Sequence, residues 1–141
     1  MERNTRQREA VLEAIDRAGR ALTPNEILAL AQASVASLNL STIYRHLNAL
    51  QSDARITKVL LPGQAARFEA ACTGDAHHGD AHHSDDPHGH AHHHHHFQCS
   101  GCDRVYALHA CPGSMQELAP KGFVVQAHEI TLRGLCASCA R

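Results

Sequence analysis

The chain has 141 residues, of which 43% are apolar and only 4% aromatic, with no Trp. Such a composition is sufficient for one ordinary domain or two small ones with an aliphatic core. A net charge of -1, with 19% charged residues, excludes a highly charged disordered tail and a polybasic, histone-like binder. No apolar run approaches the roughly 20 residues of a membrane span, and no secretory signal is visible. We therefore expect a cytoplasmic protein without a membrane partner.

Charges, histidines and cysteines are distributed unevenly along the chain. Residues 1–67 carry nine Lys or Arg and six Asp or Glu, a net +3, whereas residues 68–141 carry a net -4. Eleven of the 14 His lie between His77 and His96, and four of the six Cys form two CxxC pairs. In a chain without an export signal, such cysteines favour metal binding over disulfides.

The N-terminal half begins with two predicted helices. Apolar side chains at helical spacing predict the first helix over residues 4–18. Thr23 is followed by Pro24 and, three residues after Thr23, by Glu26, which is the pattern of a capping box. This pattern predicts a second helix that ends near Ala33.

A third helix and a hairpin follow. The apolar stripe predicts the helix over residues 41–52, and strands over 56–61 and 65–70 flank the turn at Pro62 and Gly63. Three helices followed by a hairpin are the order of a winged helix-turn-helix domain.

The third predicted helix has a polar face that can bind DNA. Its side chains can reach phosphate oxygens and base edges, and a helix fits the major groove. The alternative is the solvated face of an ordinary helix, but the order of the surrounding elements favours DNA recognition. The candidate residues are Ser41, Thr42, Tyr44, Arg45 and Asn48.

The C-terminal half has a different composition. Residues 73–92 are mostly Gly, Asp, Ala, Ser and His, which predicts a flexible linker. Beyond the linker, strands are expected over 97–99, 105–108 and 123–132, and a short helix over 112–118.

The two CxxC pairs supply ligands for one metal ion. Cys99 and Cys102 form the first pair, and Cys136 and Cys139 form the second. Four thiolates suit a closed structural Zn²⁺ site without an open position for catalysis. Redox pairs or inert thiols are the alternatives, but no βαβ pattern surrounds either pair, and the duplication argues against both. Cys111 is interpreted as a lone residue.

The His-rich run has three interpretations, which stay open: an engineered tag, a solubilising linker, or a loose metal-collecting loop. His94 and His96 differ because they alternate by two at the edge of a predicted strand and face the same side. Together with Cys72 they form a zinc-like ligand set, with Glu69 and His128 as further candidates. Cys72 is equally compatible with a single surface residue.

Six segments form a specific combination: T-R-Q-R-E-A-V-L at 5–12, L-T-P-N-E-I-L at 22–28, L-S-T-I-Y-R-H-L-N-A-L at 40–50, R-F-E at 67–69, H-H-H-F-Q-C-S-G-C at 94–102 and H-E-I-T-L-R-G-L-C-A-S-C at 128–139. With them the chain resembles, over nearly its whole length, the ferric uptake regulator (Fur) family of metal-dependent bacterial repressors. The resemblance implies an α+β fold: a winged helix-turn-helix domain over 1–70, a His-rich hinge over 71–92 and a small α/β dimerisation domain over 93–141.

The resemblance also implies partners and site residues. It implies a homodimer on a palindromic double-stranded DNA operator, with Tyr44 and Arg45 contacting DNA and Arg8 holding a phosphate. The four paired cysteines match the structural zinc site found in many members. The implied metal ligands are Glu69, His94 and His96 at the hinge, and His93, His95 and His128 at a possible additional site.

The chain departs from the family pattern at the regulatory metal. Iron and manganese sensors usually carry a His where this chain has Ala21, and an acidic ligand is expected where Ala107 and Leu108 stand. Cys72 instead occupies the position of a regulatory Cys in the zinc-sensing (Zur) branch. A thiolate suits zinc better than a reversible ferrous site.

These features together predict a zinc-responsive repressor. Its predicted regulatory ligands are Cys72, His94, His96 and Glu69. A Fur-family sensor of iron, nickel or peroxide is the alternative within the family, and a His-rich metal-storage protein or metallochaperone is the alternative outside it. An enzyme is not expected, because an HExxH motif and an open metal position are both missing from the sequence pattern.

Overall fold

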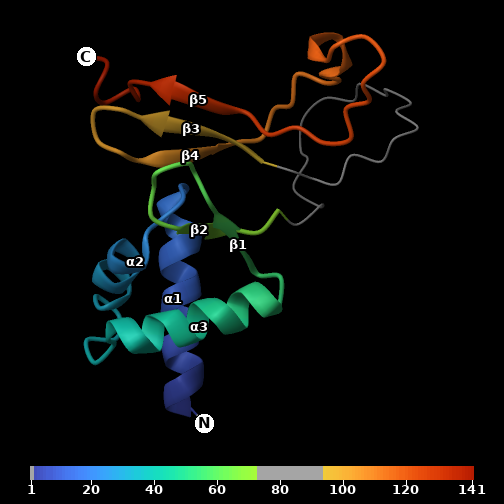
Figure 1. Ribbon diagram of the computed structural model, residues 1–141. Coiled ribbons are helices and arrows are strands. Elements are labelled where there is room, and N and C mark those ends of the chain that lie inside the picture. The colour runs from blue at the N-terminus through green and yellow to red at the C-terminus, as the bar shows by residue number, and fades with distance from the viewer. Residues whose placement is uncertain (1, 73–93) are drawn as a thin grey trace, which may run out of the picture.

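The computed structural model describes residues 2–72 and 94–141 (Figure 1). Its N-terminal part contains three helices, α1 (Glu2–Ala18), α2 (Pro24–Ala31) and α3 (Leu40–Ser52). The predicted capping box of α2 is present. The N–H of Thr23 donates to Glu26 Oε2 at 2.8 Å, and the N–H of Glu26 donates to Thr23 Oγ1 at 3.3 Å. Pro24 has no backbone N–H, so the capping box satisfies two of the three unpaired N–H groups at the helix start.

Two strands form the wing, β1 (Ile56–Val59) and β2 (Arg67–Ala70), which pair antiparallel as the hairpin prediction requires. Both strands are shorter than predicted, because the chain turns between them with Gly63 at a φ of 71°. Leu22 exchanges two backbone hydrogen bonds of 2.8 Å with Phe68, so the segment before α2 lies along the wing.

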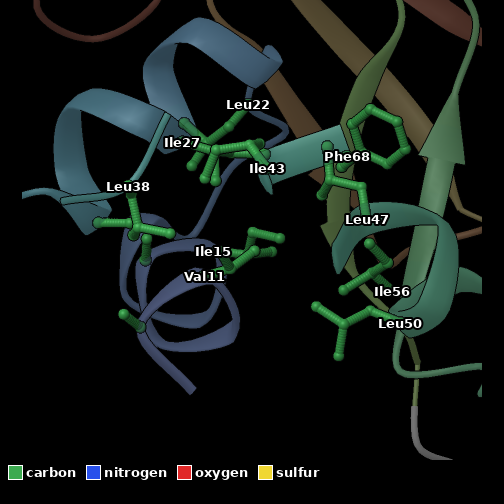
Figure 2. Packing of buried hydrophobic residues seen from close by; sticks show 13 residues of the cluster. Val11, Ile15, Leu22, Ile27, Leu38, Ile43, Leu47, Leu50, Ile56 and Phe68 are labelled. Carbon is green, nitrogen blue, oxygen red and sulfur yellow. The ribbon is translucent and has the colours of Figure 1, made fainter. Parts of the chain in front are cut away.

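One aliphatic core joins the three helices to the wing (Figure 2). The helices bury apolar side chains at helical spacing, and Phe68 of the wing lies over them. Removing each such side chain from water contributes about 1.5–3 kcal/mol. The core therefore fixes the orientation of α3. Its largest fully buried members are Val11, Ile15, Leu22, Ile27, Ile43, Leu47 and Leu50.

The C-terminal part contains a three-stranded sheet in the order β4-β3-β5. Strand β3 (His95–Cys99) pairs antiparallel with β4 (Val105–Leu108) and parallel with β5 (Thr131–Gly134). Within the described residues, the helices and small sheets give the expected α+β fold, consistent with a winged helix-turn-helix domain followed by a dimerisation domain.

Two elements predicted in the C-terminal part are much shorter in the structure than predicted. The predicted strand over 123–132 is a strand only from Thr131 onward, and the predicted helix over 112–118 is reduced to the 3₁₀ turn η1 (Gln116–Leu118). The side-chain amide of Gln116 donates to the Phe123 carbonyl at 2.7 Å and accepts from the Val125 N–H at 2.9 Å. These backbone groups therefore bind a side chain instead of a neighbouring strand.

A small apolar cluster connects the wing side to the C-terminal sheet. It contains Ala21, Val59, Leu61 and Val105, and the Ala21 N–H donates to the Val105 carbonyl at 2.9 Å. Figure 1 shows the wing directly beside this sheet. Of the predicted His-rich hinge over 71–92, residues 71 and 72 are described, and residues 73–92 lie outside the described residues. No helix in the described part of the chain is long and apolar enough to span a membrane.

Candidate functional site

Helix α3 presents the predicted DNA-binding side chains on one outer face. Ser41, Tyr44, Arg45 and Asn48 are exposed, and Tyr44 retains 49% of its surface. Thr42 is half-buried, and its N–H donates to the Asn39 side chain that caps the helix. The opposite face is buried in the core, so the helix is held with its polar face toward solvent.

Arg8 of α1 lies at the C-terminal end of α3, where it is already paired. Its guanidinium forms an ion pair with Asp53, the C-cap residue of α3, and the two side chains are 38% and 52% exposed. The pair connects α1 to the end of α3. A phosphate contact by Arg8 stays a prediction, and Asp53 would compete with the phosphate for the same guanidinium.

The two CxxC pairs converge at one end of the C-terminal sheet. The parallel pairing of Cys99 with Gly134 brings the end of β3 beside the loop that follows β5. The four sulfurs of Cys99, Cys102, Cys136 and Cys139 lie within 4.8 Å of one another.

The electrostatics of this cluster favour a bound cation. The N–H of Cys136 donates to the Cys99 sulfur at 3.2 Å and is the main reason why the pKa of Cys99 falls to about 6. The neighbouring sulfurs, Cys136 first, raise the pKa of Cys139 to about 12. Four thiolates cannot coexist at this distance without a compensating positive charge, so the donor set fits a soft or borderline divalent metal ion.

A second group of ligand atoms lies where the wing meets the sheet. Glu69 of β2 is buried, with its Oε1 3.0 Å from His94 Nδ1 and 3.1 Å from His96 Nε2. Burial raises the pKa of Glu69, but the hydrogen bonds to His96 and His94 outweigh it and hold that pKa below its ordinary value. The three predicted hinge residues are therefore in contact.

Cys72 and His109 extend this group. Their ligand atoms and one of His94 lie within 4.8 Å of one another, and the His94 and His109 rings meet edge to face at 4.9 Å. Sequence reasoning missed His109. The signal that could have found it is the antiparallel register of β3 and β4. In this register His95 pairs with Leu108, and continuing it by one residue places His94 opposite His109.

A third group contains two of the residues predicted for an additional site. Ligand atoms of His95, Cys111 and His128 lie within 4.8 Å of one another, and Cys111 Sγ is 3.3 Å from His128 Nε2. The third predicted residue, His93, lies outside the described residues. Cys111, interpreted from sequence as a lone residue, instead contacts a histidine.

His95 has a further hydrogen bond that affects its use as a ligand. Its Nδ1 accepts from the Ile130 N–H at 3.1 Å. A neutral imidazole that accepts at Nδ1 carries its proton on Nε2. Metal binding by His95 through Nε2 therefore requires this hydrogen bond to break.

Comparisons with known proteins agree with the fold. The sequence profile of the ferric uptake regulator family matches residues 2–86. The chain is similar to the Helicobacter pylori ferric uptake regulator, with a TM-score of 0.65 and 23% identity over 96% of this chain and 80% of that chain. It is also similar to a zinc-bound manganese uptake regulator, with a TM-score of 0.68 and 16% identity over 92% of this chain and 87% of that chain.

A third similar structure is a zinc uptake regulator in complex with zinc and DNA. The TM-score is 0.56 and the identity 22%, over 95% of this chain and 81% of that chain. All three likenesses extend over most of both chains and agree on one fold. Because the family profile also matches more than half of the sequence, this chain belongs to the ferric uptake regulator family of metal-sensing transcriptional regulators.

Proposed function

We propose that the protein is a zinc-responsive transcriptional repressor that binds a palindromic double-stranded DNA operator as a homodimer in the cytoplasm. The observation that most supports zinc as the signal is the position of the Cys72 thiol beside His94, between the wing and the C-terminal sheet. Thiolate and imidazole together are typical zinc ligands, whereas a reversible ferrous site favours nitrogen and oxygen donors. Ala21 is fully buried and has no ligand to offer to the site.

The position of the hinge residues supports a regulatory role. Glu69 and Cys72 belong to the wing end of the DNA-binding part, whereas His94 and His96 belong to the start of the C-terminal sheet. Ligands from both sides favour one relative arrangement of the two parts when the site is filled. In a dimer, that arrangement sets the spacing of two α3 helices, which must match half-sites about one DNA turn apart.

The other two ligand groups are assigned different roles. We assign Cys99, Cys102, Cys136 and Cys139 to a structural Zn²⁺ that holds the loop after β5 against β3. His93, His95 and His128 are assigned to a possible additional site. The H. pylori structure is described as having three functional metal-binding sites, and the described part of this chain also contains three groups of potential ligands.

Exposed apolar side chains support the homodimer. Leu118, Phe123 and Val124 are 81%, 64% and 81% exposed, and all three belong to the C-terminal part. Large apolar side chains that cluster on a surface usually mark an interaction site. The segment over 123–130 forms no strand ladder within the described residues. Gln116, Pro120 and the start of β3 bind the backbone at its two ends, so the backbone between these contacts is the part that a second copy could pair with.

One observation favours a sensor of a different metal. Glu69, His94 and His96 alone are nitrogen and oxygen donors, which suit iron, nickel or manganese. Such a protein would still be a repressor of the same family. Metal storage by the His-rich run is disfavoured because it does not account for the exposed polar face of α3.

The test uses the full chain and a random pool of DNA duplexes. The protein is incubated with the pool at buffered free Zn²⁺, Fe²⁺, Mn²⁺ or Ni²⁺, and the bound DNA is sequenced. We expect zinc to enrich a palindrome at far lower free concentration than the other ions. Equal enrichment by iron, nickel or manganese would contradict zinc sensing, and absence of any metal-dependent enrichment would contradict metal-regulated DNA binding.

A further inference from the structure

We propose that His109 is a direct ligand of the hinge metal, together with Cys72 and His94, and that Glu69 positions His94 instead of binding the ion. This inference rests on the proposed hinge site and deepens it. In this assignment Glu69 and His96 are no longer direct ligands. His109, which belongs to no sequence motif, takes their place.

Three separate segments bring the proposed ligands together. Cys72 follows β2, His94 precedes β3 and His109 follows β4. The antiparallel register of β3 and β4 places His94 opposite His109, and the ligand atoms of all three residues lie within 4.8 Å of one another. A shift of a few tenths of an ångström to about 1 Å per side chain would bring them to ordinary zinc distances of about 2.0–2.3 Å.

His94 has one ring nitrogen engaged and one available. Its side chain is 10% exposed, and its Nδ1 lies 3.0 Å from Glu69 Oε1. Its Nε2 is buried and has no hydrogen-bond partner among the described residues. When Nδ1–H donates to a carboxylate, Nε2 carries the lone pair, which is the tautomer that binds a metal. The unpartnered nitrogen is therefore the one suited to ligation.

Glu69 is placed to orient histidines. It is 4% exposed, and within the part of the chain that the structure describes its carboxylate contacts ring nitrogens of His94 and of His96. Ligation through Oε1 would weaken both hydrogen bonds. A carboxylate that fixes a metal-binding imidazole through its other nitrogen is a common outer-shell arrangement in metal sites.

The proposed set has one sulfur and two nitrogen donors. Such a set favours zinc over the harder ferrous and manganous ions. Three protein ligands leave one tetrahedral position for water, unlike the closed four-thiolate cluster. The open position suits an ion that must exchange when its concentration changes.

The test is a Co²⁺ titration of the full chain with the four-cysteine site already filled by zinc. In a Cys111→Ser background, Cys72 is the one thiol outside that site. The thiolate-to-Co²⁺ charge-transfer band then reports Co²⁺ bound to Cys72, because imidazoles of the His-rich run contain no sulfur and do not produce this band. We expect His109→Ala to raise the Co²⁺ concentration for half-saturation of this band at least about tenfold and to change the d–d bands. Glu117→Ala removes an exposed carboxylate that belongs to none of the three ligand groups, so it is the control and should shift half-saturation less than threefold.

Glu69→Gln separates positioning from ligation. We expect it to weaken binding about tenfold while leaving the d–d bands unchanged, because the coordinating atoms stay the same. Altered d–d bands in Glu69→Gln, or half-saturation within threefold of the parent in His109→Ala, would overturn the assignment. Zinc-dependent DNA binding of the unmodified chain is measured in parallel. If it persists while His109 proves dispensable, the ligand assignment alone has failed.

Discussion

The carboxylate of Glu69 on β2 lies 3.0 Å from the Nδ1 of His94, where the C-terminal sheet begins. This hydrogen bond joins the wing to the sheet through buried side chains, in addition to the apolar cluster around Ala21 and Val105. The wing and α3 share one core, so the position of α3 depends on how the wing sits on the sheet. Residues of this junction are therefore expected to affect both stability and DNA binding.

The first prediction concerns acid stability of the metal-free protein. The folded-state pKa of Glu69 is lower than its ordinary value of 4.5, so the unfolded chain binds the proton more readily. The stabilisation is complete above about pH 4.5 and is lost as the pH falls through the lowered folded pKa. Glu69→Gln should remove this dependence, so the parent should lose more stability than the variant between about pH 6 and pH 3 in urea titrations. Equal losses would contradict the role of this carboxylate.

The second prediction concerns the ion pair between Arg8 and Asp53. Asp53→Asn should release the Arg8 guanidinium for a phosphate and remove a negative charge beside the α3 face. We expect tighter operator binding and a salt dependence steeper by about 0.9 in the log–log slope, as for one added phosphate contact. An exposed ion pair contributes about 0–1 kcal/mol, so the melting temperature should change little. Unchanged affinity and slope would show that Arg8 does not contact the backbone of DNA.

The third prediction concerns Gly101, which lies between Cys99 and Cys102. A Cβ at this position would lie 3.1 Å from both Cβ and Sγ of Cys139. Gly101→Ala should therefore displace one sulfur and weaken zinc retention by the four-cysteine site by about tenfold or more, measured by chelator competition. Ser138→Ala changes an exposed neighbour and should retain zinc like the parent. Equal retention in both variants would contradict a closed four-thiolate site.

The fourth prediction concerns Arg45 on the exposed face of α3. Arg45→Ala should weaken binding to the selected operator by about 1–3 kcal/mol and reduce the preference over random DNA. Arg17→Ala, at the end of α1, removes a cation that is already paired with Glu13 and should have a much smaller effect. Similar losses in both variants would indicate a general charge effect instead of recognition by α3.

Local patterns predicted the N-terminal part well because its elements are determined by nearby residues. The capping box at Thr23 and Glu26 and the apolar stripes of the three helices act within a few turns of chain. The C-terminal part was predicted less well because its elements depend on distant partners. The segment over 123–130 has the composition of a strand, but the Gln116 side chain occupies part of its backbone.

The ligand groups show the same distinction. The CxxC spacing predicts that two sulfurs of one turn point toward one ion, and the structure brings both pairs together. His109 and Cys111 have no motif of their own. Only the β3–β4 register places His109 opposite His94, and only the course of the chain after β4 places Cys111 against His128. Such contacts depend on tertiary structure and cannot be predicted from spacing.

The central claim is tested most directly by removing the thiol of Cys72. Operator binding of the parent, Cys72→Ser and Cys111→Ser is measured by anisotropy against buffered free Zn²⁺, with zinc content and dimerisation checked for each. The account predicts that Cys72→Ser loses zinc-dependent binding while it retains the structural zinc and the dimer, and that Cys111→Ser keeps zinc-dependent binding. Normal zinc activation in Cys72→Ser would contradict the proposed sensing site.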